Sequence, residues 1–162
     1  MRGKYLILAA ALIFTALATA GAAPVLFLVR HSEKAGSGGK DPDLSAAGQR
    51  RAEALARVLR DASVTAIFTS EFKRTQETAA PLAKATHIAS IVVPANDTRA
   101  LVEKLRQVNG NALVVSHGNT IPELVKALGI ATPVTIPEDD YSELFVIVLA
   151  DQPQFLHLHY PD

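Results

Sequence analysis

The sequence contains no cysteine among its 162 residues, which excludes disulfides, thiolate metal sites and a cysteine nucleophile. It has no excess of one charge either, because 16 basic residues balance 16 acidic ones. No basic run that could follow a nucleic-acid backbone is present, so we do not expect nucleic acid as a partner. Without disulfides the fold must rest on its core, and 49% of the residues are hydrophobic.

Long hydrophobic runs are also scarce, and the longest lies near the N-terminus. Arg2 and Lys4 precede an apolar stretch from Tyr5 to Leu17, and small residues follow at 19–23. The stretch is shorter than the roughly 20 residues that cross a bilayer, and this pattern is typical of a secretory signal peptide. We predict a signal peptide over 1–22 and a periplasmic or secreted mature chain without a membrane span. The alternative is an uncleaved N-terminal anchor.

Residues 23–162 have a usual length for one domain, and their pattern alternates strands with helices. Two apolar strands at the end, joined around residues 151–153, read as a hairpin. The alternation indicates an α/β domain with three layers, an open, mainly parallel sheet and helices on both faces. The predicted strands span 25–29, 66–69, 88–93, 112–116, 143–149 and 154–160, and the predicted helices span 45–59, 75–85, 98–108 and a segment entered at Pro122.

Polar residues follow three of the predicted strands directly, as Arg30-His31, Thr69-Ser70 and Ser116-His117. Ligands of open parallel sheets bind beyond the carboxyl ends of the strands. We therefore expect these three clusters to converge on one pocket.

The residue types in these clusters suit phosphoryl transfer. Arg30 can hold two phosphate oxygens while a neutral His31 attacks phosphorus. Arg74 begins a predicted helix, whose N-terminus also favours an anion. His117 could stabilise charge on the equatorial oxygens. Either histidine motif alone is weak evidence, and it is the order of the three clusters along the chain that gives them weight.

Four motifs in this order resemble those of the histidine phosphatase superfamily, which also contains the cofactor-dependent phosphoglycerate mutases. They are Leu28–His31, Leu44–Gly48, Ser70–Thr78 and Val114–Gly118. The resemblance implies a phosphoglycerate mutase-like fold, with His31 as the phosphorylated nucleophile. It also implies that Arg30 and Arg74 bind the phosphoryl group, that His117 completes the pocket, and that no metal or organic cofactor takes part.

The sequence departs from the common family pattern at two places. Ser32 stands where glycine is usual after the nucleophile, and we expect its hydroxyl beside the phosphate. No glutamate matches the family's proton donor clearly, so we assign the general acid to Asp97, which could equally be a simple helix cap. Glu33 is expected to contact substrate or orient an imidazole. The weaker candidates for the acid are Glu71, Asp139 and Glu143.

The expected reaction is hydrolysis of a small phosphorylated substrate, such as a sugar phosphate or a cell-envelope phosphate, through a phosphohistidine on His31. A catalytically weak phosphoryl-binding module is the first alternative, and a phosphomutase is the second.

His157 and His159 could bind a transition metal from one face of the last strand, with His87 or a carboxylate as a further ligand. No third ligand lies at a recognisable spacing in the sequence, so we interpret that strand as solvent-facing and predict no metal site.

Overall fold

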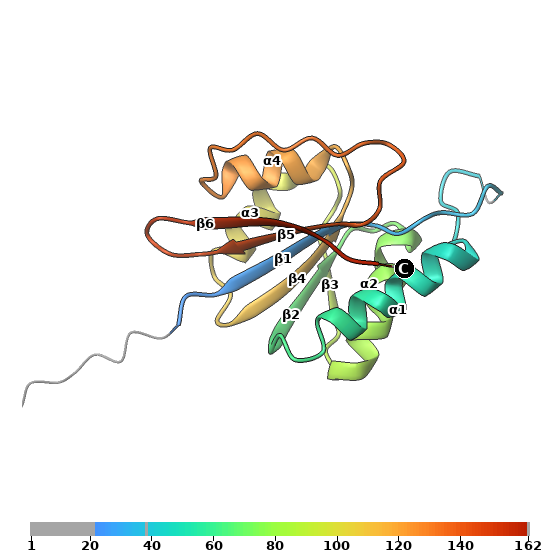
Figure 1. Ribbon diagram of the computed structural model, residues 1–162, viewed down its shortest axis with the longest axis horizontal. Helices are drawn as coiled ribbons and strands as arrows, with labels where there is room; N and C mark the ends of the chain where they lie inside the picture. Colours follow the sequence, from blue (N-terminus) through green and yellow to red (C-terminus); the bar gives the residue numbers. More distant parts are fainter. Residues whose placement is uncertain (1–21, 38, 162) are drawn as a thin grey trace, which may run out of the picture.

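The computed structural model describes residues 22–37 and 39–161 (Figure 1). The predicted signal peptide lies almost wholly outside the described residues and stays a prediction. Within the described part of the chain, no helix has the length and apolar character needed to cross a membrane.

Six strands form one sheet in the order β3-β2-β4-β1-β5-β6. The first four in this order pair in parallel, whereas β5 and β6 pair antiparallel with their neighbours. This confirms the mainly parallel sheet and the terminal hairpin. The strands are β1 (Val25–Arg30), β2 (Val64–Thr69), β3 (Ser90–Val92), β4 (Asn111–Ser116), β5 (Glu143–Val148) and β6 (Gln154–His159).

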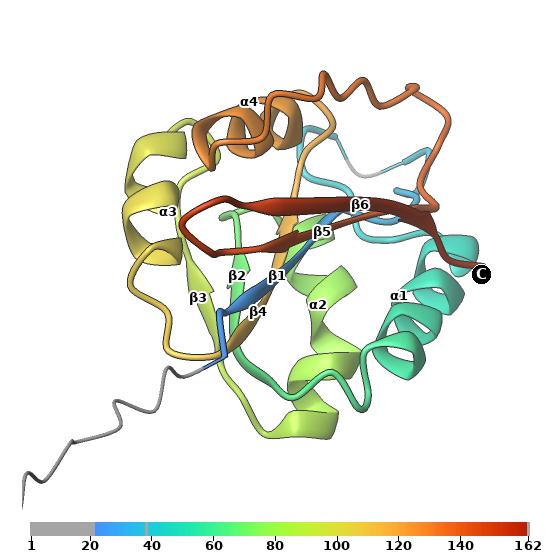
Figure 2. The ribbon, with the colours of Figure 1, turned by 60° about the vertical axis from the view of Figure 1, so that its left-hand side comes forward.

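Helices cover both faces of the sheet, as the two ribbon views show (Figures 1 and 2). Helices α1 and α2 pack together on one face, and α3 and α4 pack together on the other. The three-layer architecture predicted from the alternating pattern is thus present. The helices are α1 (Ala46–Val58), α2 (Lys73–Thr86), α3 (Thr98–Leu105) and α4 (Thr120–Ala127).

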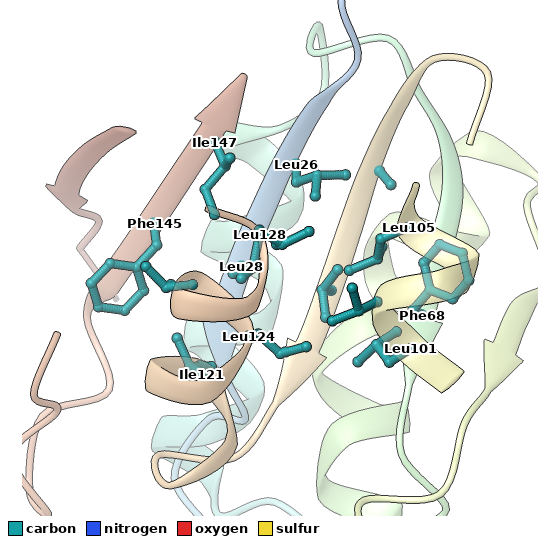
Figure 3. Packing of buried hydrophobic residues seen from close by; sticks show 14 of the residues in the cluster. Leu26, Leu28, Phe68, Leu101, Leu105, Ile121, Leu124, Leu128, Phe145 and Ile147 are labelled. Atoms are coloured by element: carbon teal, nitrogen blue, oxygen red, sulfur yellow. The ribbon is translucent and has the colours of Figure 1, made fainter. Parts of the chain in front are cut away.

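Side chains of β1 alternate between two hydrophobic cores, because successive residues of a strand point to opposite faces. Leu26 and Leu28 enter the core under α3 and α4 (Figure 3), while Val29 enters the core under α1 and α2. All three are fully buried. Burial on both faces explains the uninterrupted apolar sequence of this strand.

The predicted elements differ from the observed ones mainly at their ends. Edge strand β3 pairs over only three residues, fewer than predicted. Helix α3 ends at Leu105, three residues earlier than predicted. Helix α4 begins two residues before Pro122, and proline is tolerated there because the first turn lacks intrahelical N–H bonds.

The sheet register brings the three polar clusters to one edge. Arg30 is paired with Ser116, and Thr69 is paired with Val115. The backbone N–H of His31 then donates to the carbonyl of Ser116 at 2.8 Å. The carboxyl ends of β1, β2 and β4 therefore meet, as the sequence predicted.

Candidate active site

His31 lies just beyond β1 with its ring buried, and one hydrogen bond fixes which of its nitrogens carries the proton. Its Nδ1 is 2.8 Å from the carbonyl oxygen of Ser32. A carbonyl oxygen only accepts, so Nδ1 holds the proton and Nε2 keeps its lone pair. Burial lowers the pKa of His31 to about 4, which leaves the ring neutral at ordinary pH. These are the properties of an imidazole nucleophile.

His117 faces His31 edge to face, with 5.4 Å between the ring centroids. It follows β4 and is also buried. Burial, followed by the positive charge of Arg74, lowers its pKa to about 4. A bound phosphate dianion would favour its protonated form, because an adjacent opposite charge stabilises the cation.

A chain of two hydroxyl groups orients His117. Its Nε2 is 3.0 Å from Ser70 Oγ, which is 2.9 Å from Thr75 Oγ1. Thr75 Oγ1 reaches two carbonyl oxygens, those of Phe72 at 2.8 Å and Ser70 at 3.1 Å, and we expect its single proton on one of them. With that arrangement Ser70 donates to Thr75 and accepts from His117, which predicts a proton on Nε2 of His117.

Arg74 is the second residue of α2, and its guanidinium lies 4.3 Å from the ring centroid of Phe72. Asp41, from the glycine-containing loop before α1, approaches it at 3.6 Å. That distance is long for a charge-assisted hydrogen bond. The guanidinium therefore keeps donors for an anion.

Arg30 is held by the segment between α4 and β5. Its Nη1 donates to the carbonyl oxygens of Pro137 at 3.0 Å, Glu138 at 2.7 Å and Asp140 at 3.2 Å. The guanidinium carbon lies 4.2 Å from the ring centroid of Tyr141. Its Nε is buried and has no hydrogen-bond partner among the described residues. An unpaired buried donor on a cation is costly, and a phosphate oxygen would satisfy it.

The four residues line one cavity of about 300 Å³. A neighbouring cavity of about 400 Å³ shares Arg74 and His117 with it and adds Glu71 and Asn96. The structure thus brings together His31, His117, Arg30 and Arg74. It also brings Glu71 close to them, the residue that sequence analysis ranked below Asp97.

Asp97 is not brought to this site. Its Oδ1 accepts from the backbone N–H of Ala100 at 2.9 Å as the N-cap of α3, and it lines neither of the two cavities. The geometry favours the helix-cap interpretation, because the carboxylate is occupied by the orphan donors of the first turn.

Ser32 and Glu33 also differ from expectation, since neither lines the cavity. Ser32 is fully buried, and its backbone N–H donates to Thr78 Oγ1 at 2.9 Å. Glu33 forms an ion pair with Arg51 at 2.8 Å. Both residues support the loop that carries His31.

Sequence reasoning missed the carbonyl oxygens that hold Arg30 and the hydroxyl chain behind His117. Every residue has a backbone carbonyl, so the sequence does not reveal which carbonyls bind Arg30. Ser70 and Thr75 lie inside the motif Ser70–Thr78, and their spacing around the start of a helix was the available signal.

In comparison with known families, the model of the histidine phosphatase superfamily (branch 1) matches residues 26–103. This span begins within β1, contains the whole of α1 and α2, and ends within α3. No curated protein sequence matches the chain.

Solved structures with the same fold include the protein histidine phosphatase SixA in complex with tungstate. The two chains are 19% identical, the alignment covers 83% of this chain and 96% of SixA, and the TM-score is 0.68. A mycobacterial glucosyl-3-phosphoglycerate phosphatase is 18% identical, with 85% of this chain and 98% of the other covered and a TM-score of 0.64.

Proposed function

We propose that this chain, which the model of the histidine phosphatase superfamily matches over residues 26–103, hydrolyses phosphomonoesters through a phosphohistidine on His31. The observation that carries the proposal is the hydrogen bond from His31 Nδ1 to the Ser32 carbonyl, which leaves Nε2 unprotonated in the cavity that also holds Arg30 and Arg74. The unpaired Nε of Arg30 supports a phosphate in that cavity.

In the first step, the two guanidinium groups hold the phosphoryl oxygens and Nε2 of His31 attacks phosphorus. A nitrogen–phosphorus bond forms as the bond to the leaving oxygen breaks, and that oxygen takes a proton from an acid. His117 balances the negative charge on the phosphoryl oxygens. In the second step, the conjugate base of that acid takes a proton from water, the water oxygen attacks phosphorus, the nitrogen–phosphorus bond breaks and inorganic phosphate leaves.

Glu71 is the residue we propose as the proton donor, in place of Asp97. It lines the cavity that contains Arg74 and His117, whereas Asp97 caps α3 outside it. One carboxylate oxygen, Oε2, accepts from the backbone N–H of Ala95 at 2.8 Å, which fixes the side chain on the rim of the site.

Turnover of a substrate panel by the mature protein tests both assignments. The panel contains p-nitrophenyl phosphate, sugar phosphates and a phosphohistidine peptide. Sugar phosphates and the phosphohistidine peptide are included because the structural neighbours are named for such substrates. We expect His31→Ala to abolish phosphate release from every substrate. Glu71→Gln should lower kcat about tenfold to a hundredfold for sugar phosphates, but much less for p-nitrophenyl phosphate, whose leaving group needs no proton.

Each result has a distinct meaning. Full turnover in His31→Ala would overturn the nucleophile assignment. If Glu71→Gln lowered kcat equally for sugar phosphates and for p-nitrophenyl phosphate, Glu71 would be ruled out as the acid. Asp97→Asn is the matched control. Phosphate binding without turnover of any substrate would favour the phosphoryl-binding module, and transfer to a second hydroxyl would favour the phosphomutase.

A further inference from the structure

The β5–β6 hairpin gathers one buried carboxylate and two imidazoles on the same face of the sheet. In its antiparallel register Glu143 lies opposite His159, and Phe145 lies opposite His157. Side chains two residues apart on a strand share a face, so Glu143, His157 and His159 become neighbours. One potential ligand atom from each of the three lies within 4.8 Å of the others. The register thus supplies the third ligand that sequence spacing did not reveal.

Glu143 is only 5% exposed, although carboxylates are rarely this buried without a partner. Its Oε1 lies 3.3 Å from His157 Nε2. Its Oε2 is buried with no hydrogen-bond partner among the described residues. An unpaired buried carboxylate oxygen costs free energy, and a bound cation would remove that cost.

The two imidazoles are held in place by stacking. The ring of His157 stacks on Phe145 with 4.5 Å between the centroids, and the ring of His159 stacks on His157 at 5.1 Å. Phe145 belongs to the core and is fully buried, so it is a firm support for the first ring. Ligands held in this way lose little side-chain freedom when they bind.

We propose that Glu143, His157 and His159 bind one divalent transition-metal ion of the Zn²⁺, Co²⁺, Ni²⁺ and Cu²⁺ class. Two imidazole nitrogens and one carboxylate oxygen suit these ions, whereas Mg²⁺ and Ca²⁺ prefer oxygen ligands alone. The side chain of His157 is 39% exposed, which leaves a path for the ion and a position for water. None of the three residues lines the cavity around His31. The ion would join β6, the edge strand, to β5.

Titration of the mature, untagged, chelator-treated protein with ZnCl₂ tests this proposal, with MgCl₂ as the comparison. Calorimetry should show one Zn²⁺ per chain, and Tm should rise with the Zn²⁺ concentration because the ion binds only the native hairpin. His157→Ala and His159→Ala should each weaken binding about tenfold or more. Both side chains are exposed, so both variants are expected to fold. Co²⁺ should give an absorption band that these variants lose.

Two further variants serve as controls. His87→Asn changes an exposed histidine outside the cluster, at a position with φ 57° that asparagine tolerates, and His31→Ala removes an imidazole of the active site. Both should bind Zn²⁺ as the parent protein does. The proposal is overturned if neither hairpin variant changes Zn²⁺ affinity, if His31→Ala abolishes binding, or if Mg²⁺ binds as tightly as Zn²⁺. It is equally overturned if no Zn²⁺ binds.

Discussion

At the residue scale, hydrogen-bond partners govern which nitrogen of His31 and of His117 carries the proton. The Ser32 carbonyl holds the proton of His31 on Nδ1, and the hydroxyl chain through Ser70 predicts a proton on Nε2 of His117. The two rings therefore present different atoms to the cavity. This difference fits a nucleophile beside a group that stabilises charge.

Ser70→Ala should disturb the orientation of His117 without removing any group that touches phosphate. The lost hydrogen bond is worth ~1 kcal/mol, so we expect kcat/KM to fall about fivefold. Nitrogen-15 NMR of His117 should show the proton on Nε2 in the parent protein and a mixture of tautomers in Ser70→Ala. Thr75→Val should have a similar effect, and Thr75→Ser should restore the parent behaviour. A proton on Nδ1 in every variant would contradict the proposed hydroxyl chain.

Residue types in the site could be predicted from the sequence, but their partners could not. Arg30, His31, Arg74 and His117 stand at strand and helix ends, where pattern reasoning finds them. Asp97 stands at a similar place, yet its carboxylate caps a helix. A strand end and a helix cap attract the same polar residues, so only the geometry separates them.

At the element scale, the docking of α1 against the loop that carries His31 depends on a glycine. A Cβ added at Gly48 would collide with the carbonyl oxygen of Glu33 and lie 3.0 Å from its backbone N. The backbone N–H of Ser45 donates to the same carbonyl at 2.8 Å. The glycine of the motif Leu44–Gly48 is thus explained by a close approach of helix and backbone.

Gly48→Ala should lower the free energy of unfolding by about 1–3 kcal/mol, because rigid backbone must shift to admit the methyl group. It should also lower activity, since the displaced residue is two positions from His31. Denaturant unfolding measures the first effect. Gly36→Ala is the matched control, because an added Cβ there meets nothing within 4 Å. Equal stability of the two variants would contradict this account of the packing.

Element types were predictable because both faces of the sheet are covered, which makes the inner strands continuously apolar. The helix at 45–59 was placed closely by its Ser45 cap, which accepts from Gly48 N–H at 3.1 Å. Edge strand β3 was placed less well, because it has one neighbour and exposed side chains such as Ile91. The segment at 131–142 could not be anticipated, since it contacts Arg30 through backbone carbonyls.

At the scale of the whole molecule, two buried neutral imidazoles make stability depend on pH. The pKa of His31 and of His117 is about 4 in the native protein, against 6.5 as the usual value. Between these values the unfolded chain binds more protons than the native one, so the free energy of unfolding falls as pH falls from 6.5 to 4. Below about 4 this contribution levels off.

His31→Asn should reduce this pH dependence. The fall in pKa from 6.5 to about 4 corresponds to roughly 3 kcal/mol for one imidazole. We therefore expect the difference in the free energy of unfolding between parent and variant to change by up to roughly 3 kcal/mol from pH 7 to pH 4. Urea unfolding across that range provides the measurement, with His87→Asn as the control. A difference that stays constant with pH would show that His31 titrates normally.

The most direct test of the central claim is to trap the phosphorylated enzyme. Protein without the predicted signal peptide (residues 23–162) is mixed with a phosphorus-32-labelled substrate, quenched in alkali, which preserves phosphohistidine, and digested for mass spectrometry. The account predicts an acid-labile label on the peptide that contains His31 and none in His31→Ala. A label on another residue, or continued turnover and labelling in His31→Ala, would contradict it.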